Sequence, residues 1–285
     1  MRVVFLLGLT WVPLAKSAIA QNESGQSDPA INASGVPAEF ESDGDQGSDG
    51  EDHNHAIFVW SIVLGCVAGG FGIVGLVLLL ILRYEKKRTA ELAIIANELG
   101  VQFSPHKDER LLSMLQQFRL FNSGHSRRMK NVMTAATEHT ILTIFDYQFT
   151  TGGGKHSQTH SHTLVAVESS AFQFPRFSIW PEGLGDKIGA KFGRQDIDFD
   201  QHPDFSSKFV LQADHENAVR RFLTSQILDW CVSRPDLSVD SVPGLLTYRK
   251  AGRKKPEEIR NFMSEAYDFA RVLEENSRGQ NREQA

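Results

Sequence analysis

The sequence has few cysteines, and this scarcity limits how the chain can be stabilised. Among 285 residues only Cys66 and Cys231 are cysteines. Cys66 lies inside a long apolar run and Cys231 in the polar part far beyond it, so the two thiols cannot pair within one chain. The sequence therefore excludes a fold that depends on disulfides.

Charge is missing from residues 56–82, which are predominantly apolar. Four basic residues follow closely: Arg83, Lys86, Lys87 and Arg88. At about 1.5 Å per residue the apolar run reaches roughly 40 Å, more than the roughly 30 Å of a bilayer's hydrocarbon core. Because basic flanks favour the cytoplasmic side, the sequence predicts a single-pass protein of the cell membrane, with residues 83–285 in the cytoplasm.

The N-terminus has the pattern of a secretory signal peptide. Residues 1–20 begin with Arg2, continue through an apolar stretch, and end with Ala18 and Ala20 at the positions that signal peptidase prefers. Lys16 lies close to this site, so an uncleaved first anchor stays an alternative. Both alternatives predict the same topology, with the N-terminal part outside and the C-terminal domain inside.

Basic residues are also missing from residues 21–55, where nine acidic residues stand among Gly, Ser, Asn and Pro. Such a segment cannot bury a core, and we expect it to be disordered and exported. Without these nine acids, and without Arg2 and Lys16, 26 acidic and 28 basic residues remain, a net charge of about +2. This balance argues against a nucleic-acid partner.

Small residues form a stripe along one face of the predicted transmembrane helix. At about 100° per residue these positions share a sector of roughly 120°. Small residues let two helices approach closely, so we expect homodimerisation, or packing on another span, through this face. The stripe consists of Ser61, Gly65, Ala68, Gly69, Gly72 and Gly75.

Residues 83–275 are predicted to form one cytoplasmic α+β domain, mainly an antiparallel sheet packed by flanking helices. The membrane helix should continue to Leu99, with Gly100 as its cap, and Asp108 should start a second helix. Alternating apolar residues between 129 and 167 predict strands, and Gly152-Gly153-Gly154 a hairpin turn.

Further strands are expected at residues 176–180, 196–199, 208–212 and 245–249. Asp214 should cap one helix that continues to Pro235, and Pro256 suits the first turn of a final helix. Residues 276–285 are polar, so we expect a disordered tail there.

Three histidines suggest a metal site. His156, His160 and His162 occupy even positions, so in an extended strand they would share a face, and Asp146 across the hairpin would supply a fourth ligand. The alternative is a solvent-facing polar hairpin whose imidazoles titrate near pH 6.5. No other cofactor is expected.

Five cations gather before the final helix: Arg249, Lys250, Arg253, Lys254 and Lys255. A loop of this kind contacts anionic lipid headgroups or an acidic partner when it is exposed. Catalytic motifs are absent, since the sequence contains neither Gly-x-Ser-x-Gly nor His-Glu-x-x-His, and the glycines before Lys155 lack the spacing of a phosphate-binding loop.

The motifs Phe145-Asp146-Tyr147, Thr151 to Lys155, Leu246 to Arg249 and Pro256-Glu257-Glu258 resemble a family of bacterial single-pass membrane proteins of unknown function. The resemblance spans roughly residues 83–275. It implies a bacterial cell membrane and supplies no catalytic residues.

These observations favour a binding protein over an enzyme. We expect an adaptor or transmembrane transmitter whose cytoplasmic domain binds an unidentified cytoplasmic protein. Two alternatives stay open: a membrane-tethered, metal-dependent hydrolase that uses the histidine hairpin, and a domain that binds anionic lipid.

Overall fold

The computed structural model describes residues 49–183 and 196–283, with side chains from 57 to 183 and from 196 to 279. The signal peptide predicted at residues 1–20, and the acidic segment up to residue 48, lie outside the described residues. The chain divides into two units between Leu64 and Gly65. Everything below concerns the second unit, except where helix α1 is followed to its start.

Helix α1 runs without a break from Asp49 to Leu99. Within the described residues it is the one helix long and apolar enough to cross a membrane, and its apolar window is fully exposed. The helix ends where the sequence predicts, because Gly100 takes the left-handed conformation at φ +68° and donates its N–H to the carbonyl of Asn97. The predicted continuation past the basic flank is thus confirmed.

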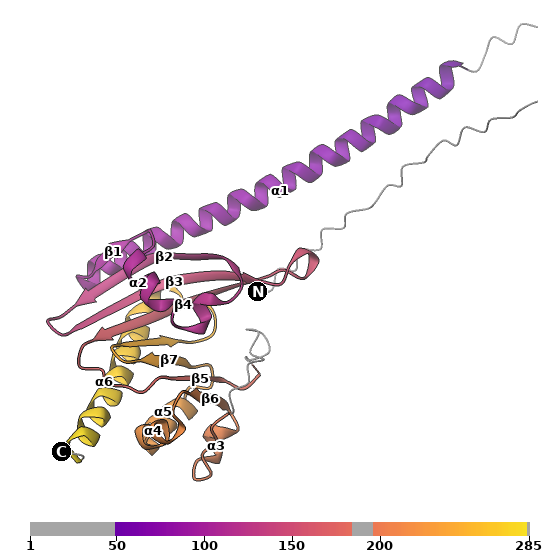
Figure 1. The fold of residues 1–285 in the computed structure, drawn as a ribbon. Coiled ribbons are helices and arrows are strands. Elements are labelled where there is room, and N and C mark those ends of the chain that lie inside the picture. The colour runs from indigo at the N-terminus through magenta and orange to yellow at the C-terminus, as the bar shows by residue number, and fades with distance from the viewer. Residues whose placement is uncertain (1–48, 184–195, 284–285) are drawn as a thin grey trace, which may run out of the picture. The chain divides into compact units, whose positions relative to one another are not determined.

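Eight antiparallel strands form one sheet (Figure 1). They are β1 (Gln102–Ser104), β2 (His125–Ala136), β3 (Thr140–Thr151), β4 (Gln158–Ser169), β5 (Phe177–Pro181), β6 (Phe209–Ala213), β7 (Ser238–Val242) and β8 (Leu245–Arg249). Their spatial order is β1-β2-β3-β4-β8-β7-β5-β6. The prediction of an antiparallel sheet with flanking helices is confirmed, and β8 has the predicted bounds.

Both faces of the sheet are covered, each by a different set of residues. Ile144 and Val165 pair across β3 and β4 and belong to a core that includes Leu92 of α1. Phe145 and Leu164, one position along on each strand, belong to a second core. Because successive strand residues point to opposite faces, the two cores lie on opposite sides.

The first core receives the longer helices. These are α1, α4 (Glu216–Phe222), α5 (Ser225–Val232) and α6 (Ile259–Glu283), with the short α3 (Pro203–Ser206). The second core is closed by α2 (Glu109–Leu115) and the 3-10 turn η1 (Arg119–Asn122). Asp108 caps α2 as predicted, since its carboxylate accepts from the Leu111 N–H at 2.9 Å.

The structure differs from the prediction in several elements. The single helix expected from Asp214 to Pro235 is two helices, α4 and α5, because Leu223 and Thr224 leave the helical conformation. The break lets both short helices turn apolar residues into the same core. Residues 196–199 form no strand, since the Asp196 carboxylate accepts from the Leu211 N–H and takes the place of a ladder bond. Strand β7 was not predicted.

Helix α6 extends to Glu283, past the predicted end near residue 275. Two i,i+4 ion pairs, Arg271–Glu275 and Arg278–Glu274, favour this extension. Asn276 adds a tertiary bond, since its amide donates to the carbonyl of Phe222 at 2.6 Å. The polar end of the chain is therefore helical through Glu283.

Replacing Gly124 with Ala should destabilise the domain strongly. Gly124 has φ +62°, and a Cβ there would lie 2.2 Å from the carbonyl oxygen of Thr150. The left-handed conformation and this backbone clash together should cost at least about 2 kcal/mol of unfolding free energy. Gly252→Ala is the matched control, because Gly252 has φ +74° with nothing within 4 Å of a Cβ. Equal losses in denaturant unfolding would contradict this reasoning.

Candidate functional site

The four predicted metal ligands do not share one face of the sheet. On β4, His160 pairs with Phe149 and His162 with Tyr147, and both imidazoles stack on the Phe149 ring. Asp146, the residue before Tyr147, pairs with Thr163, the residue after His162. Because direct partners share a face and neighbours alternate, the Asp146 carboxylate points to the opposite side from both histidines.

His156 is also separated from the strand. It belongs to the 3-10 turn η2 (Gly154–His156), which precedes β4, and its side chain is exposed. The predicted alignment of three histidines along one strand is therefore wrong. Over residues 57–183 and 196–279, no group of three His, Cys, Asp or Glu side chains is placed to hold a metal ion.

Asp146 is instead the centre of a buried polar cluster. It is 3 % exposed. Arg88 of α1 donates to its two carboxylate oxygens from Nε and Nη2, each at 2.8 Å. The remaining donors are Asn131 at 2.9 Å, Thr163 at 2.8 Å and Arg253 at 3.1 Å. Every donor comes from a different part of the chain, so Asp146 joins α1 to β2, β4 and the segment after β8.

The cluster extends through Glu85, which lies one turn before Arg88 on α1. Glu85 accepts from Arg253 at 2.6 Å and also pairs with Lys130 of β2. We call these seven residues the junction cluster: Glu85, Arg88, Lys130, Asn131, Asp146, Thr163 and Arg253. Each charged side chain in the junction cluster pairs with another member of opposite charge.

Electrostatics keep the junction cluster ionised. Burial alone would raise the pKa of Asp146, but the hydrogen bond from Arg88 and the charges of Arg253 and Arg88 hold that pKa at about 2. Burial likewise opposes ionisation of Glu85, and its bonds to Arg253 and Lys130 lower its pKa nonetheless. The cluster therefore keeps its charges through the physiological range.

The five cations predicted as a lipid-contacting loop are mostly internal. Arg249 belongs to β8 and is 5 % exposed. Lys250 donates to Glu265 at 2.8 Å, and Arg253 belongs to the junction cluster. Lys255 is exposed, and the half-buried Lys254 has its ammonium 5.5 Å from the Phe262 ring centroid. Arg249 is thus buried, and Lys250 and Arg253 are paired with acids of the domain itself, so contact with lipid or an acidic partner stays a prediction for Lys254 and Lys255.

The small residues of α1 lie on an open surface. A Cβ at Gly65, Gly69, Gly72 or Gly75 would meet nothing within 4 Å. Ala68 is exposed as well, and the Ser61 hydroxyl, in the first unit, donates to the carbonyl of Phe58 at 2.7 Å. Among the described residues, nothing packs against the four glycines of this stripe.

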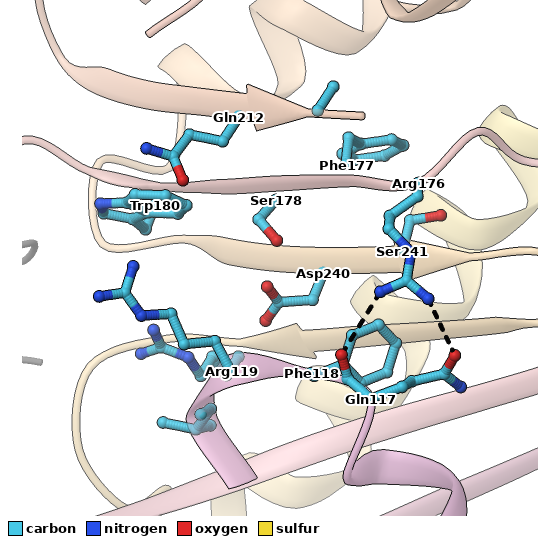
Figure 2. A pocket seen from close by; sticks show the side chains of 13 residues that line it. Gln117, Phe118, Arg119, Arg176, Phe177, Ser178, Trp180, Gln212, Asp240 and Ser241 are labelled. Carbon is cyan, nitrogen blue, oxygen red and sulfur yellow. Dashed lines mark hydrogen bonds between the residues drawn. The ribbon is translucent and has the colours of Figure 1, made fainter. Parts of the chain in front are cut away.

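A cavity of ≈ 170 Å³ opens where η1 meets strands β5 and β7 (Figure 2). Sequence reasoning did not find it. Figure 2 shows the Ser178 hydroxyl pointing toward Asp240, with Trp180 and Arg119 on the same side of the view. The walls combine apolar, amide, hydroxyl and charged side chains. The lining residues are Gln117, Phe118, Arg119, Leu120, Arg176, Phe177, Ser178, Trp180, Gln212, Ala213, Asp240, Ser241 and Arg249.

Asp240 is the acid of this cavity. Burial raises its pKa, while hydrogen bonds from Ser178 and Thr247 and the charges of Arg249 and Arg119 act in the other direction. Ser178 and Thr247 stand beside it because they pair with Asp240 on the two neighbouring strands. Asp240 is therefore held by three adjacent strands.

Two donors at the cavity lack partners. The Nε of Arg249 and the Nε1 of Trp180 are buried without a hydrogen bond. Burial lowers the pKa of Arg249, and the charge of Asp240 opposes that shift. Arg176, at the other end of the cavity, lies 3.4 Å from the Gln117 side-chain oxygen and 3.5 Å from Asp214.

The cavity had a weak signal in the sequence. Ser178, Asp240 and Thr247 are polar residues that pair side by side on three neighbouring strands. Recognising them required the pairing of β7 with β5 and β8, and β7 itself was missed.

Comparisons with known proteins gave no match: no family model, no curated protein and no solved structure matches the chain. The function must therefore be argued from the geometry, and the resemblance to bacterial single-pass membrane proteins stays an interpretation of the sequence.

Replacing Arg88 with Met should destabilise the domain by about 3 kcal/mol, because breaking a buried ion pair leaves an uncompensated charge. The adjacent Lys87→Met is the matched control, since Lys87 is exposed and pairs only with Glu91 at 3.6 Å. That change should stay within about 0.5 kcal/mol. Chemical denaturation of both variants measures the difference, and a similar loss in each would show that the pair is dispensable.

Replacing His162 with Leu should make the domain less sensitive to acid. Burial, with the charges of Arg249 and His160, lowers the pKa of His162 to about 3, against the titration near pH 6.5 expected from the sequence. Because the folded pKa lies below the unfolded value, His162 costs stability as pH falls from 6.5 toward 3.

Between pH 7 and pH 5 the wild type should lose about 2 kcal/mol more than His162→Leu. Denaturant unfolding at the two pH values measures this difference. His156→Leu, which removes an exposed imidazole, should behave as the wild type. Parallel losses in all three proteins would refute the buried, neutral histidine.

Proposed function

We propose that this chain is a single-pass membrane protein that works as a transmitter, with a cytoplasmic binding domain built directly onto the transmembrane helix. One observation carries the proposal. Helix α1 does not end with the apolar run but enters the domain, where Arg88 pairs with buried Asp146 and Leu92 and Ala96 lie in the core. A helix held in this way moves with the domain.

The charges around the end of the apolar run support a cytoplasmic domain. Arg83, Lys86 and Lys87 are exposed, whereas Arg88 is 4 % exposed and serves the junction cluster. Three exposed cations therefore follow the apolar run directly, which is the arrangement that favours the cytoplasmic side.

The open stripe on α1 supports a dimer. Ala90 follows Gly65 by about seven helical turns, so it lies at nearly the same angle around the helix axis. Ala90 is exposed, and Ile94, one turn further, is 59 % exposed. The face that we propose for contact between spans thus continues along the part of α1 that the domain holds.

The other functions have less support from the geometry. A metal-dependent hydrolase would need Asp146 beside the histidines, and the sheet places it on the opposite face. Lipid recognition by residues 249–255 would need exposed cations, and three of the five are internal.

Disulfide crosslinking in membranes tests the proposed transmitter. In a Cys66→Ser background, Ala68→Cys and Ala90→Cys should both form disulfide-linked dimers on oxidation, whereas Val67→Cys, on the opposite side of the helix, should not. Cys231 does not compete, because it is fully buried and burial raises its thiol pKa to about 12. Gly65→Leu with Gly69→Leu should abolish crosslinking, and Val67→Leu with Val74→Leu should leave it unchanged.

Insertions then test whether the helix couples the span to the domain. Two alanines after Leu82 turn the domain by about 200° relative to the span, and seven alanines by about two full turns. Crosslinking at Ala90→Cys should fail with two alanines and return with seven, while Ala68→Cys stays linked in both. Equal crosslinking at Ala90→Cys with two and with seven inserted alanines would refute stiff coupling between the span and the domain.

A further inference from the structure

The cavity under η1 has an imbalance of charge. Its walls contain three arginines, Arg119, Arg176 and Arg249, and one acid, Asp240. Arg176 has its own acidic neighbour in Asp214, 3.5 Å away. Asp240 is the one acid among the residues that line the cavity, and its charge acts on Arg119 and Arg249.

Arg249 is the most constrained of the three. It is 5 % exposed, and its Nε has no hydrogen-bond partner. A buried guanidinium in this condition is unfavourable, because burial removes its hydration and nothing replaces one of its bonds. Its position is set by β8, where it pairs with Leu164 on one side and Ser238 on the other, and neither side chain carries a compensating charge.

Trp180 limits the kind of ligand group that can complement the cavity. Its Nε1, like the Nε of Arg249, is a buried donor without an acceptor. Guanidinium and indole nitrogens donate and never accept. The group that complements this end of the cavity is therefore an acceptor with negative charge, and the indole ring offers an apolar surface beside it.

We propose that this cavity binds the oxyanion group of a small organic molecule, a carboxylate or a phosphate, on Arg249 and Arg119, with the apolar part of the ligand against Trp180. Guanidinium groups suit both oxyanions, because their paired N–H donors match two oxygens at once. A cavity of ≈ 170 Å³ fits a small molecule and excludes a polymer. The inference names a ligand class for the binding domain and so rests on the proposed function.

Binding is measured on the full chain in lipid nanodiscs, by thermal melting and by calorimetric titration. Three anionic probes, phenyl phosphate, benzoate and inorganic phosphate, are compared with neutral benzamide. The aromatic anions should raise the melting temperature and bind at least tenfold more tightly than benzamide. Preference for phenyl phosphate would indicate a phosphate ester, and preference for benzoate a carboxylic acid.

Two substitutions should move anion affinity in opposite directions. Arg249→Met should lower it at least tenfold, and Asp240→Asn should raise it about threefold, because the competing carboxylate is gone. Lys255→Met is the charge-matched control, since Lys255 is exposed in the same segment, and it should bind as the wild type. Opposite shifts of this kind are not expected if the arginine and the acid serve stability alone.

Three results would overturn the inference: no binding of any anion at 10 mM, equal binding of benzamide, or unchanged affinity in a folded Arg249→Met. If Arg249→Met fails to fold, the Asp240→Asn variant tests the proposal instead. An anion affinity of Asp240→Asn equal to or below that of the wild type would contradict the proposal. Failure here leaves the crosslinking pattern of α1 untouched, and failure of crosslinking leaves anion binding untouched. The two proposals are therefore refuted separately.

Discussion

The pairing of Arg88 with Asp146 is the constraint on which the arrangement of this protein depends. Apolar contacts alone would hold α1 on the sheet without fixing its rotation, because Leu92 and Ala96 present a narrow apolar contact. Two hydrogen bonds of 2.8 Å between Arg88 and Asp146 allow one orientation only. Buried ion pairs add little net stability, since desolvation offsets their attraction, but they discriminate strongly between alternative geometries. The junction cluster therefore sets which face of α1 is open and which is buried.

The two faces of the sheet have different roles. One accepts α1 and α6 on apolar residues and, under α1, on the junction cluster, whereas the other is apolar under α2 and polar beside η1. The change occurs along β8, where Leu245 lies in the second core and Arg249, at the other end of the strand, lines the cavity. Within five residues, β8 therefore changes from an apolar side chain in the core, Leu245, to a buried arginine on the cavity wall, Arg249.

Local signals in the sequence predicted local structure well. Asp108, Gly100 and the triple glycine after β3 act on backbone within a few residues of themselves, so their effects were readable without the fold. The pairing of β4 with β8 and of β7 with β5 joins segments far apart, and no local pattern specifies it. Asp146 was placed with the histidines because the hairpin was recognised but its register was not, and a shift of one residue changes the face. Arg249 was predicted to end a strand but was grouped with the cations that follow it, since its burial depends on strands that the sequence does not identify as neighbours.

The ends of the sheet have a consequence if the domain is tethered to a membrane beside other copies, as proposed. Strand β1 has three residues, and at the other end Leu211 of β6 uses its outward N–H and carbonyl on Asp196 and Ile197. Neither edge offers a long row of free backbone groups to another sheet. Crowding on a membrane would raise the local concentration of such domains greatly, and blunt edges protect them from joining strand to strand into aggregates. Contacts between copies are then left to side chains, where they can be specific and reversible.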